Sequence, residues 1–303
     1  MADGRDARAG QVSSGCMPVF IPLSNGKIEE DEDGENSDDG QPYAVVAPDC
    51  NLWENYSRIT FSFFDGNGIQ RAKVHRAILK WAMYINLTFV ECQSGGDIRI
   101  GFDEAAGSWS TVGTFARMVG LNEPTMNLGW INAETESTIP AEEGVILHEF
   151  GHALGLLHEH QSPARHGVLT FNATETIRDF RIAHSWTHDM VEESVLHVWN
   201  QSELSSHSRF DTRSIMMYSI PGTITEEGNT IQNNNVLSDL DKAYVILYYP
   251  RSRRDELCQE WTISRALELV GVDGEPQKNI LKTENPDSIR QMFIQWNENN
   301  RTV

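Results

Sequence analysis

Three histidines and one glutamate lie close together in the middle of the chain, in the segment HEFGHALGLLH. Successive residues of a helix turn by about 100°, so His148 and His152 lie one turn apart on the same face. Two imidazole nitrogens at this spacing can bind one Zn²⁺ ion. Glu149 lies on the flank of that face, where its carboxylate can reach a metal-bound water without binding the metal. The pattern predicts a zinc site with a general base beside it.

A third ligand requires a break in this helix. In a continuous helix, His158 would point away from His148 and His152. Gly155 can adopt a left-handed conformation that ends the helix and turns the chain back, so we expect His158 to be the third ligand. Three neutral protein ligands and an open fourth position are typical of a catalytic rather than a structural zinc site.

Histidines that fall by chance on an ordinary amphipathic helix are the alternative explanation. A glycine and a third histidine rarely follow the HExxH pattern at these positions by chance, which favours the metal site. The remaining histidines have no metal-binding spacing, and we expect them at the surface or in hydrogen bonds. They are His75, His160, His166, His184, His188, His197 and His207.

Composition limits the partners of the chain. The net charge is -20, so nucleic acid and anionic membrane surfaces are disfavoured as partners by charge repulsion. No apolar run approaches the roughly 18 residues of a membrane span, and no signal peptide is visible at the N-terminus. Four cysteines are too few for a disulfide scaffold and allow three pairings. Oligomeric state is not indicated by the sequence.

Hydrophobic periodicity predicts an α/β (α+β) fold around the histidine segment. Alternating and β-branched runs predict five strands, at 59–64, 87–92, 98–102, 107–115 and 126–131. Apolar residues from Val74 to Ile85 recur at spacings of three and four, which predicts a helix that starts near Ile69. The Gly- and Ser-rich run 107–115 is expected to be an edge strand.

The histidine helix is expected to begin near Pro140, capped by Ser137 or Thr138, with Glu142 and Glu143 in its positive first turn. Further helices are predicted at three places, 237–249, 261–270 and 286–296.

Domain organisation follows from composition. We expect a disordered acidic N-terminal segment at 1–46, a catalytic domain at 47–250 and a partly helical C-terminal extension at 251–303.

The histidine segment resembles the signature of the metzincin clan, and a glutamate directly after the third histidine, Glu159, resembles the astacins. The run SIMMY at 214–218 is similar to the Met-turn of this clan. The resemblance implies that Met216 lies under the zinc and that Tyr218 ligates zinc or swings to the oxyanion. Astacins usually have histidine at the position of Met217, so this chain is similar to a divergent group of them.

The resemblance covers about Cys50 to Pro250 and implies the metzincin zincin fold. This fold has an upper subdomain with a twisted mixed sheet and two long helices, and an irregular lower subdomain with a closing helix. The resemblance also implies that the protein is secreted, as is usual in this family, although no signal peptide is visible. Cys16 could ligate the zinc as a latency thiolate, or it could be an incidental cysteine.

Together the residues and the resemblance predict a zinc-dependent endopeptidase that acts on a protein or peptide substrate. A zinc-bound water, activated by Glu149, is expected to attack the internal peptide bond, and Tyr218 to stabilise the oxyanion. The edge strand is expected to bind the substrate as an added strand. A catalytically silent zinc-fold binding protein, or a zinc hydrolase of non-peptide substrates, are the alternatives.

Overall fold

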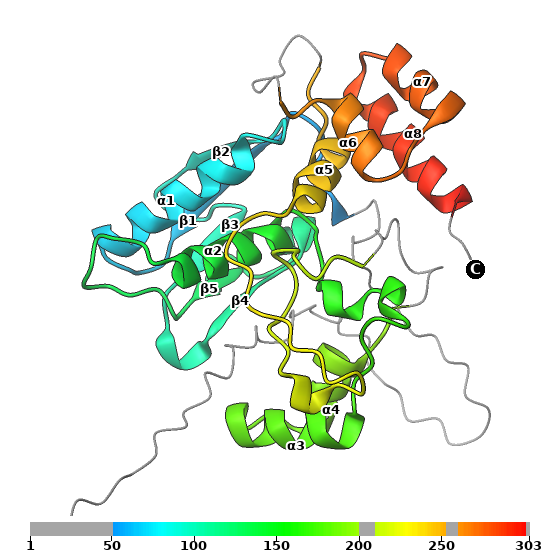
Figure 1. Cartoon of the computed structure of the whole chain (residues 1–303). Helices are drawn as coiled ribbons and strands as arrows, with labels where there is room; N and C mark the ends of the chain where they lie inside the picture. The colour runs from blue at the N-terminus through cyan, green and yellow to red at the C-terminus, as the bar shows by residue number, and fades with distance from the viewer. Residues whose placement is uncertain (1–50, 200–209, 253–259, 301–303) are drawn as a thin grey trace, which may run out of the picture.

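The computed structural model describes residues 51–199, 210–252 and 260–300 (Figure 1). The acidic segment 1–46, predicted to be disordered, lies outside the described residues. The first half of the described chain forms a five-stranded sheet in the order β2-β1-β3-β5-β4, with β4 antiparallel to β5 and the other pairs parallel. The strands are β1 (Arg58–Phe63), β2 (Thr88–Glu91), β3 (Ile98–Gly101), β4 (Ser108–Ser110) and β5 (Met126–Leu128). The mixed sheet and the edge position of β4 confirm the predicted fold class.

Two strands are much shorter than their sequence predicts. Of the run 126–131, only Met126–Leu128 forms strand. The run 107–115 forms strand only at β4, and a short 3₁₀ turn, Gly113–Arg117, replaces the rest. Gly113 has a φ of 50°, and a Cβ there would collide with the backbone oxygen of Asn51. The chain leaves the sheet because this left-handed glycine is packed directly against the segment before β1.

Two helices, α1 (Gly68–Ala82) and α2 (Pro140–Ala153), share one apolar core with the sheet (Figure 1). The indole Nε1 of Trp81 on α1 donates a hydrogen bond of 3.0 Å to the carbonyl oxygen of Leu147 on α2. Phe150 of α2 packs edge-on against Phe89 of β2, with ring centroids 6.0 Å apart. These contacts fix the rotation of α2, and therefore the direction in which its histidines point.

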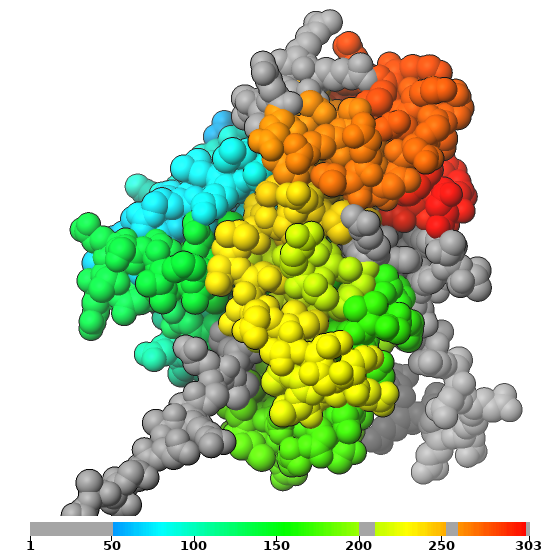
Figure 2. All heavy atoms as spheres, in the orientation of Figure 1, coloured from blue at the N-terminus to red at the C-terminus, as the bar shows by residue number. Residues whose placement is uncertain are grey.

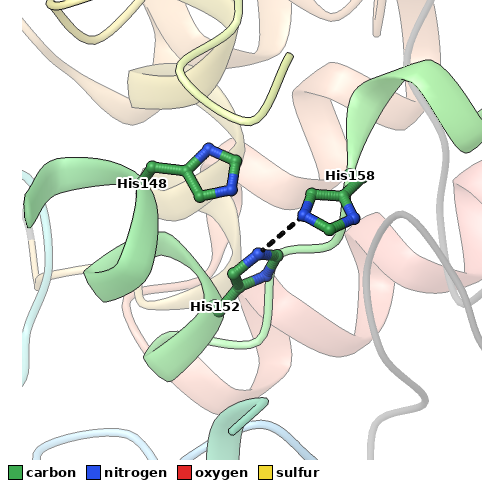
Figure 3. A group of neighbouring side chains, drawn as sticks. All are labelled: His148, His152 and His158. Atoms are coloured by element: carbon green, nitrogen blue, oxygen red, sulfur yellow. Dashed lines mark hydrogen bonds between the residues drawn. The ribbon is translucent and has the colours of Figure 1, made fainter. Parts of the chain in front are cut away.

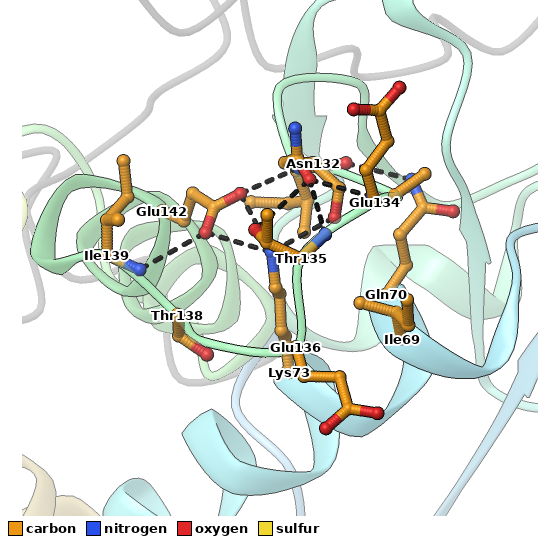
Figure 4. A network of polar contacts seen from close by, with 12 residues as sticks. Ile69, Gln70, Lys73, Asn132, Glu134, Thr135, Glu136, Thr138, Ile139 and Glu142 are labelled. Atoms are coloured by element: carbon orange, nitrogen blue, oxygen red, sulfur yellow. Dashed lines mark hydrogen bonds and ion pairs between the residues drawn. The ribbon is translucent and has the colours of Figure 1, made fainter.

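The start of α2 differs from the prediction. Its N-cap is Ile139, which makes no side-chain cap, so the predicted caps Ser137 and Thr138 are wrong. The carboxylate of Glu142 instead accepts hydrogen bonds from the backbone N–H groups of Ile139 (3.2 Å) and Asn132 (2.7 Å). Lys73 of α1 lies 3.0 Å from the same carboxylate (Figure 4). Although burial opposes ionisation, these hydrogen bonds lower the pKa of Glu142.

The stretch between α2 and residue 238 is mostly irregular, as predicted for a lower subdomain. It contains α3 (Ala173–His184), α4 (His188–Val191) and a π-helical turn, Glu192–Leu196. Short 3₁₀ turns occur there at Glu159–Gln161, Pro163–Arg165 and Gly222–Ile224, and another precedes β4 at Glu104–Ala106. A separate apolar cluster, which includes Trp186 and Tyr218, supports this part. Helix α5 (Asp239–Tyr248) then returns to the main core, close to the predicted 237–249.

Three helices follow α5: α6 (Ile263–Leu269), α7 (Gly274–Lys282) and α8 (Pro286–Asn299). The first and last confirm the predicted helices, whereas α7 was not predicted. All three contribute side chains to the main core. Figure 1 shows them grouped beside α5. Arg290 of α8 donates hydrogen bonds to the carbonyl oxygens of Trp53 (2.9 Å) and Tyr248. The C-terminal segment therefore packs on the sheet domain, and the division at residue 250 stays a prediction.

Within the described ranges, no helix combines the length and the apolar character needed to cross a bilayer.

Replacing Glu142 by leucine should destabilise the chain, because the side chain of Lys73 is fully buried and would lose its counter-charge. We expect a loss of about 3–5 kcal/mol in the free energy of unfolding, measured by urea denaturation. The double variant Lys73→Met/Glu142→Leu should recover at least half of that loss. Equal losses in the single and double variants would contradict the role of this ion pair.

Candidate metal centre and active site

The structure brings the three predicted histidines together (Figure 3). His148 and His152 project from α2, and His158 returns to them from the segment after the helix. One ring nitrogen from each lies within 4.8 Å of the others, a group that could hold a metal ion. The Nε2 atoms of His152 and His158 are 3.1 Å apart. Among the described residues this is the only such group of three metal-ligating side chains.

The turn that returns His158 is built on Gly155, as predicted. Its φ is 97°, and a Cβ there would lie 2.8 Å from Cδ2 of Leu52. The N–H of Leu156 donates to the carbonyl oxygen of Gly151 (2.9 Å), which closes the end of α2. The carbonyl oxygen of Leu156 in turn accepts a hydrogen bond of 2.8 Å from Nδ1 of His152. The turn therefore both ends the helix and orients one of the histidines.

Hydrogen bonding leaves the inner nitrogens of two histidines without a proton. Nδ1 of His148 lies 2.8 Å from the carbonyl oxygen of Ile215, which can only accept, so Nδ1 carries the proton. Nδ1 of His152 also carries its proton, because it lies 2.8 Å from the carbonyl oxygen of Leu156. The Nε2 atom of His148 is buried and has no hydrogen-bond partner. A buried, unpartnered lone pair beside two further imidazole nitrogens is the donor set that Zn²⁺ prefers, so these residues fit the metal.

Burial keeps the three rings neutral. It lowers the pKa of His148 to about 4 and holds the pKa values of His152 and His158 well below the usual range. The hydrogen bonds from the rings to backbone carbonyls oppose this shift without overcoming it. Neutral imidazoles are the form that binds metal.

Residues 214–217 form a tight turn, the Met-turn, which packs against α2. A Cβ at Gly151 would collide with the sulfur of Met216, so only glycine allows this contact. The N–H of Glu159 donates to the carbonyl oxygen of Met216 (3.1 Å), and the Glu159 carboxylate accepts from the N–H of Asp211 (2.8 Å). The turn is therefore joined to the residue that follows the third histidine.

A buried carboxylate fixes this turn from the other side. Asp241 on α5 accepts hydrogen bonds from the hydroxyl of Ser214 (2.7 Å) and from the N–H groups of Ile215 and Ser238 (2.8 Å each). Burial raises its pKa despite these bonds. The carbonyl oxygen of Ile215 in turn accepts from Nδ1 of His148, so Asp241 is linked to His148 through the backbone of one residue. Sequence reasoning missed this role, although Ser238-x-x-Asp241 is a visible capping pattern.

Tyr218 lies against the metal centre, as the resemblance implies. Its ring centroid is 4.5 Å from that of His158 and 4.2 Å from that of His160. His160 is completely buried, and its Nε2 donates to the carbonyl oxygen of Ser194 (2.9 Å). The hydrogen-bonded state of His160 was predicted, but its stacking on Tyr218 was not, because nothing in local spacing indicates it.

Glu149 is 1% exposed and lines a cleft beside His148. Tyr218 and Trp130 line the same cleft, and for Trp130 this confirms a predicted position in the core or cleft wall. The cleft is thus lined by both residues predicted to act on the substrate, Glu149 and Tyr218, together with His148.

A mixed five-stranded sheet with two helices, and three histidines that could hold a metal, define a metzincin-type metallopeptidase. The sequence profile of the Astacin peptidase family matches residues 46–239, well over half of the chain. The chain belongs to the astacin family, a family of zinc-dependent metalloendopeptidases.

Individual relatives agree with this assignment. Metallopeptidase AprA of Pseudomonas marginalis is 26% identical over 166 residues, which cover 52% of this chain and 34% of the relative. Zinc metalloproteinase nas-38 of Caenorhabditis elegans is 29% identical over 123 residues, 40% of this chain and 15% of the relative. The match thus spans about a third or less of these two relatives. A structure of myroilysin has a TM-score of 0.63 at 33% identity and covers 68% of this chain and 98% of myroilysin.

Replacing Asp241 by asparagine should weaken zinc binding, because an uncharged amide replaces the carboxylate and its Nδ2 takes the place of one of the two accepting oxygens, either the one bonded to Ser214 or the one bonded to Ile215 and Ser238. We expect zinc affinity to fall about 10- to 100-fold, measured by competition with a chromogenic chelator. Asp239→Asn is the matched control, since Asp239 is on the same helix with its side chain 53% exposed, and its affinity should be unchanged. A folded Asp241→Asn variant with wild-type zinc affinity would contradict the positioning role.

Proposed function

We propose that the chain is a zinc-dependent endopeptidase in which His148, His152 and His158 bind the metal and Glu149 is the general base. One observation carries the proposal most directly. Glu149 follows His148 on α2, and both residues line the same cleft. When bound, Zn²⁺ supplies Lewis acidity, which polarises a peptide carbonyl and lowers the pKa of water.

Two side chains that line the cleft, Glu149 and Tyr218, carry out the remaining steps of the proposed reaction. The carboxylate of Glu149 takes the proton of the attacking water and passes it to the amine of the leaving peptide. The hydroxyl of Tyr218 donates a hydrogen bond to the oxygen of the scissile carbonyl as that oxygen gains negative charge. The close, tilted ring contacts of Tyr218 with His158 and His160 support this role because they keep the ring beside the histidine group.

The substrate backbone binds along β4. This strand is paired only with β5, so its outer edge offers N–H and C=O groups to an added antiparallel strand. An extended peptide bound there uses its own backbone, which explains how an endopeptidase accepts many internal sequences. We propose residues 47–250 as the catalytic unit and 251–303 as an extension packed on it.

Glu149→Ala should keep one zinc per chain and lose about 10²- to 10⁴-fold in peptide hydrolysis, because proton transfer is lost while the ligands remain. Zinc-loaded variants are compared on a denatured protein mixture, with cleavage sites read by mass spectrometry and a chelator as control. Glu143→Ala is the matched variant, because Glu143 lies on the same helix in an ion pair with Lys80.

Chelator-sensitive internal cuts by the wild type and by Glu143→Ala, but not by Glu149→Ala, are the expected result. Normal hydrolysis by Glu149→Ala would refute the mechanism. One bound zinc without any cuts by the wild type would favour the silent binding protein.

Tyr218→Phe should lower kcat about tenfold with little change in KM, because a hydrogen bond made mainly in the transition state is lost. The phenyl ring retains the ring contacts with His158 and His160, so folding and zinc content should be those of the wild type. Steady-state kinetics on one quenched peptide measures both constants. An unchanged kcat would remove Tyr218 from the mechanism.

A further inference from the structure

The end of helix α2 presents backbone carbonyl oxygens that the helix itself cannot bond. Three of them are satisfied by the turn that follows, because the N–H groups of residues 154–156 donate to the carbonyl oxygens of residues 150–152. The next two carbonyl oxygens, those of Ala153 and Leu154, accept from side chains instead. The indole Nε1 of Trp53 donates to Ala153 (2.7 Å), and the hydroxyl of Tyr249 donates to Leu154 (2.7 Å). Two aromatic side chains from outside α2 therefore cap its end.

This capped end of α2 adjoins two of the three proposed metal ligands. Leu154 lies two residues before Leu156, whose carbonyl oxygen accepts the hydrogen bond from Nδ1 of His152. Gly155, between the two leucines, has the left-handed conformation that turns the chain back toward His158. A shift of residue 154 would therefore turn the ring of His152 and displace His158 together.

The guanidinium of Arg290, on helix α8, holds both aromatic caps. Its Nη1 donates to the carbonyl oxygen of Trp53 (2.9 Å), and its Nε donates to the carbonyl oxygen of Tyr248, the residue before Tyr249. The same guanidinium lies over the ring of Tyr249, with Cζ 4.9 Å from the centroid. Arg290 is only 9% exposed, so these contacts replace the water that the buried charge has lost.

The two caps are also bonded to each other. The backbone N–H of Trp53 donates to the hydroxyl of Tyr249 (3.3 Å), which in turn donates to Leu154. Burial raises the pKa of Tyr249 although the charge of Arg290 opposes the shift, so the hydroxyl keeps the proton that it donates. The guanidinium and the two aromatic residues thus form one connected unit at the end of α2.

Arg290 belongs to a part of the chain that the Astacin profile does not match. That match ends at residue 239, whereas α8 spans Pro286–Asn299. Figure 2 shows the orange and red C-terminal helices lying directly against the yellow segment below them. Ile289 and Phe293 of α8 are buried in the main core. The contacts of Arg290 therefore connect a helix beyond the profile match to the turn that carries the third histidine.

We propose that Arg290 is a positioning residue of the metal centre. It holds the two aromatic caps at the end of α2 and thereby fixes the turn that returns His158. The inference rests on the proposed zinc site and gives the C-terminal helices a part in it.

Zinc affinity of full-length variants, measured by competition with a chromogenic chelator, tests this role. Arg290→Met removes the guanidinium and keeps an unbranched side chain, whereas Tyr249→Phe removes only the hydroxyl that donates to Leu154. We expect zinc affinity to fall about tenfold in both variants, as for other residues that orient metal ligands. Arg290→Lys keeps the charge and should recover part of the loss.

Two control variants separate positioning from stability. Phe293→Leu removes buried ring volume from the same helix and keeps Arg290, so its Tm should fall while its zinc affinity stays within twofold of the wild type. Arg265 of α6 also lies over a ring, that of Trp261 (4.5 Å), but it hydrogen-bonds to Glu260. Arg265→Met should likewise keep its zinc affinity within twofold.

Wild-type zinc affinity in Tyr249→Phe or in folded Arg290→Met would overturn the inference. A loss of affinity in Phe293→Leu as large as that in Tyr249→Phe would also overturn it, because zinc binding would then follow the stability of the core. If Arg290→Met does not fold, Tyr249→Phe and Phe293→Leu decide between these results. Zinc bound by the wild type without any peptide cleavage would overturn the proposed function alone, since the affinities still test the positioning role.

Discussion

The buried carboxylate of Asp241 joins the closing helix α5 to the Met-turn, and through Ile215 of that turn to His148 on α2. It accepts three hydrogen bonds, two of them from Ser214 and Ile215 at the start of the Met-turn, and it belongs to the closing helix α5. Ile215 passes this constraint to His148 through its carbonyl oxygen. A carboxylate is suited to this position because it accepts several bonds at once, and burying it unpartnered would be costly. The orientation of His148, one of the three proposed metal ligands, therefore depends on a residue outside the histidine group.

Two glycines allow the backbone to approach closely enough for this arrangement. Gly151 lets the sulfur of Met216 lie directly against α2, and Gly155 reverses the chain so that His158 returns. A third, Gly144, admits the asparagine run 233–235, which lines the cleft beside Glu149. Helix α2 thus carries two of the three proposed metal ligands, the proposed general base and part of the cleft wall, so a small shift of α2 would move all of them together.

The sequence predicts what depends on local spacing. His148 and His152 one helical turn apart, and the break at Gly155, follow from helical geometry and backbone sterics. Contacts between distant segments were not predictable in this way. The hydrogen bonds of Asp241 span 26 or 27 residues to the Met-turn, and the cap of α2 depends on an ion pair with α1. Helix α7 was not predicted because Ile280 is its only buried residue, so its sequence has no periodic row of apolar residues.

X-ray absorption at the zinc edge of the purified, zinc-loaded chain tests the central claim most directly. The account predicts three imidazole nitrogens at about 2.0–2.1 Å, one or two further oxygen ligands and no sulfur, since catalytic sites keep a position open to water or substrate. Substitution of His148, His152 or His158 by alanine should remove imidazole scattering from the spectrum. A sulfur ligand at about 2.3 Å, or a spectrum unchanged by these substitutions, would contradict an open three-histidine site.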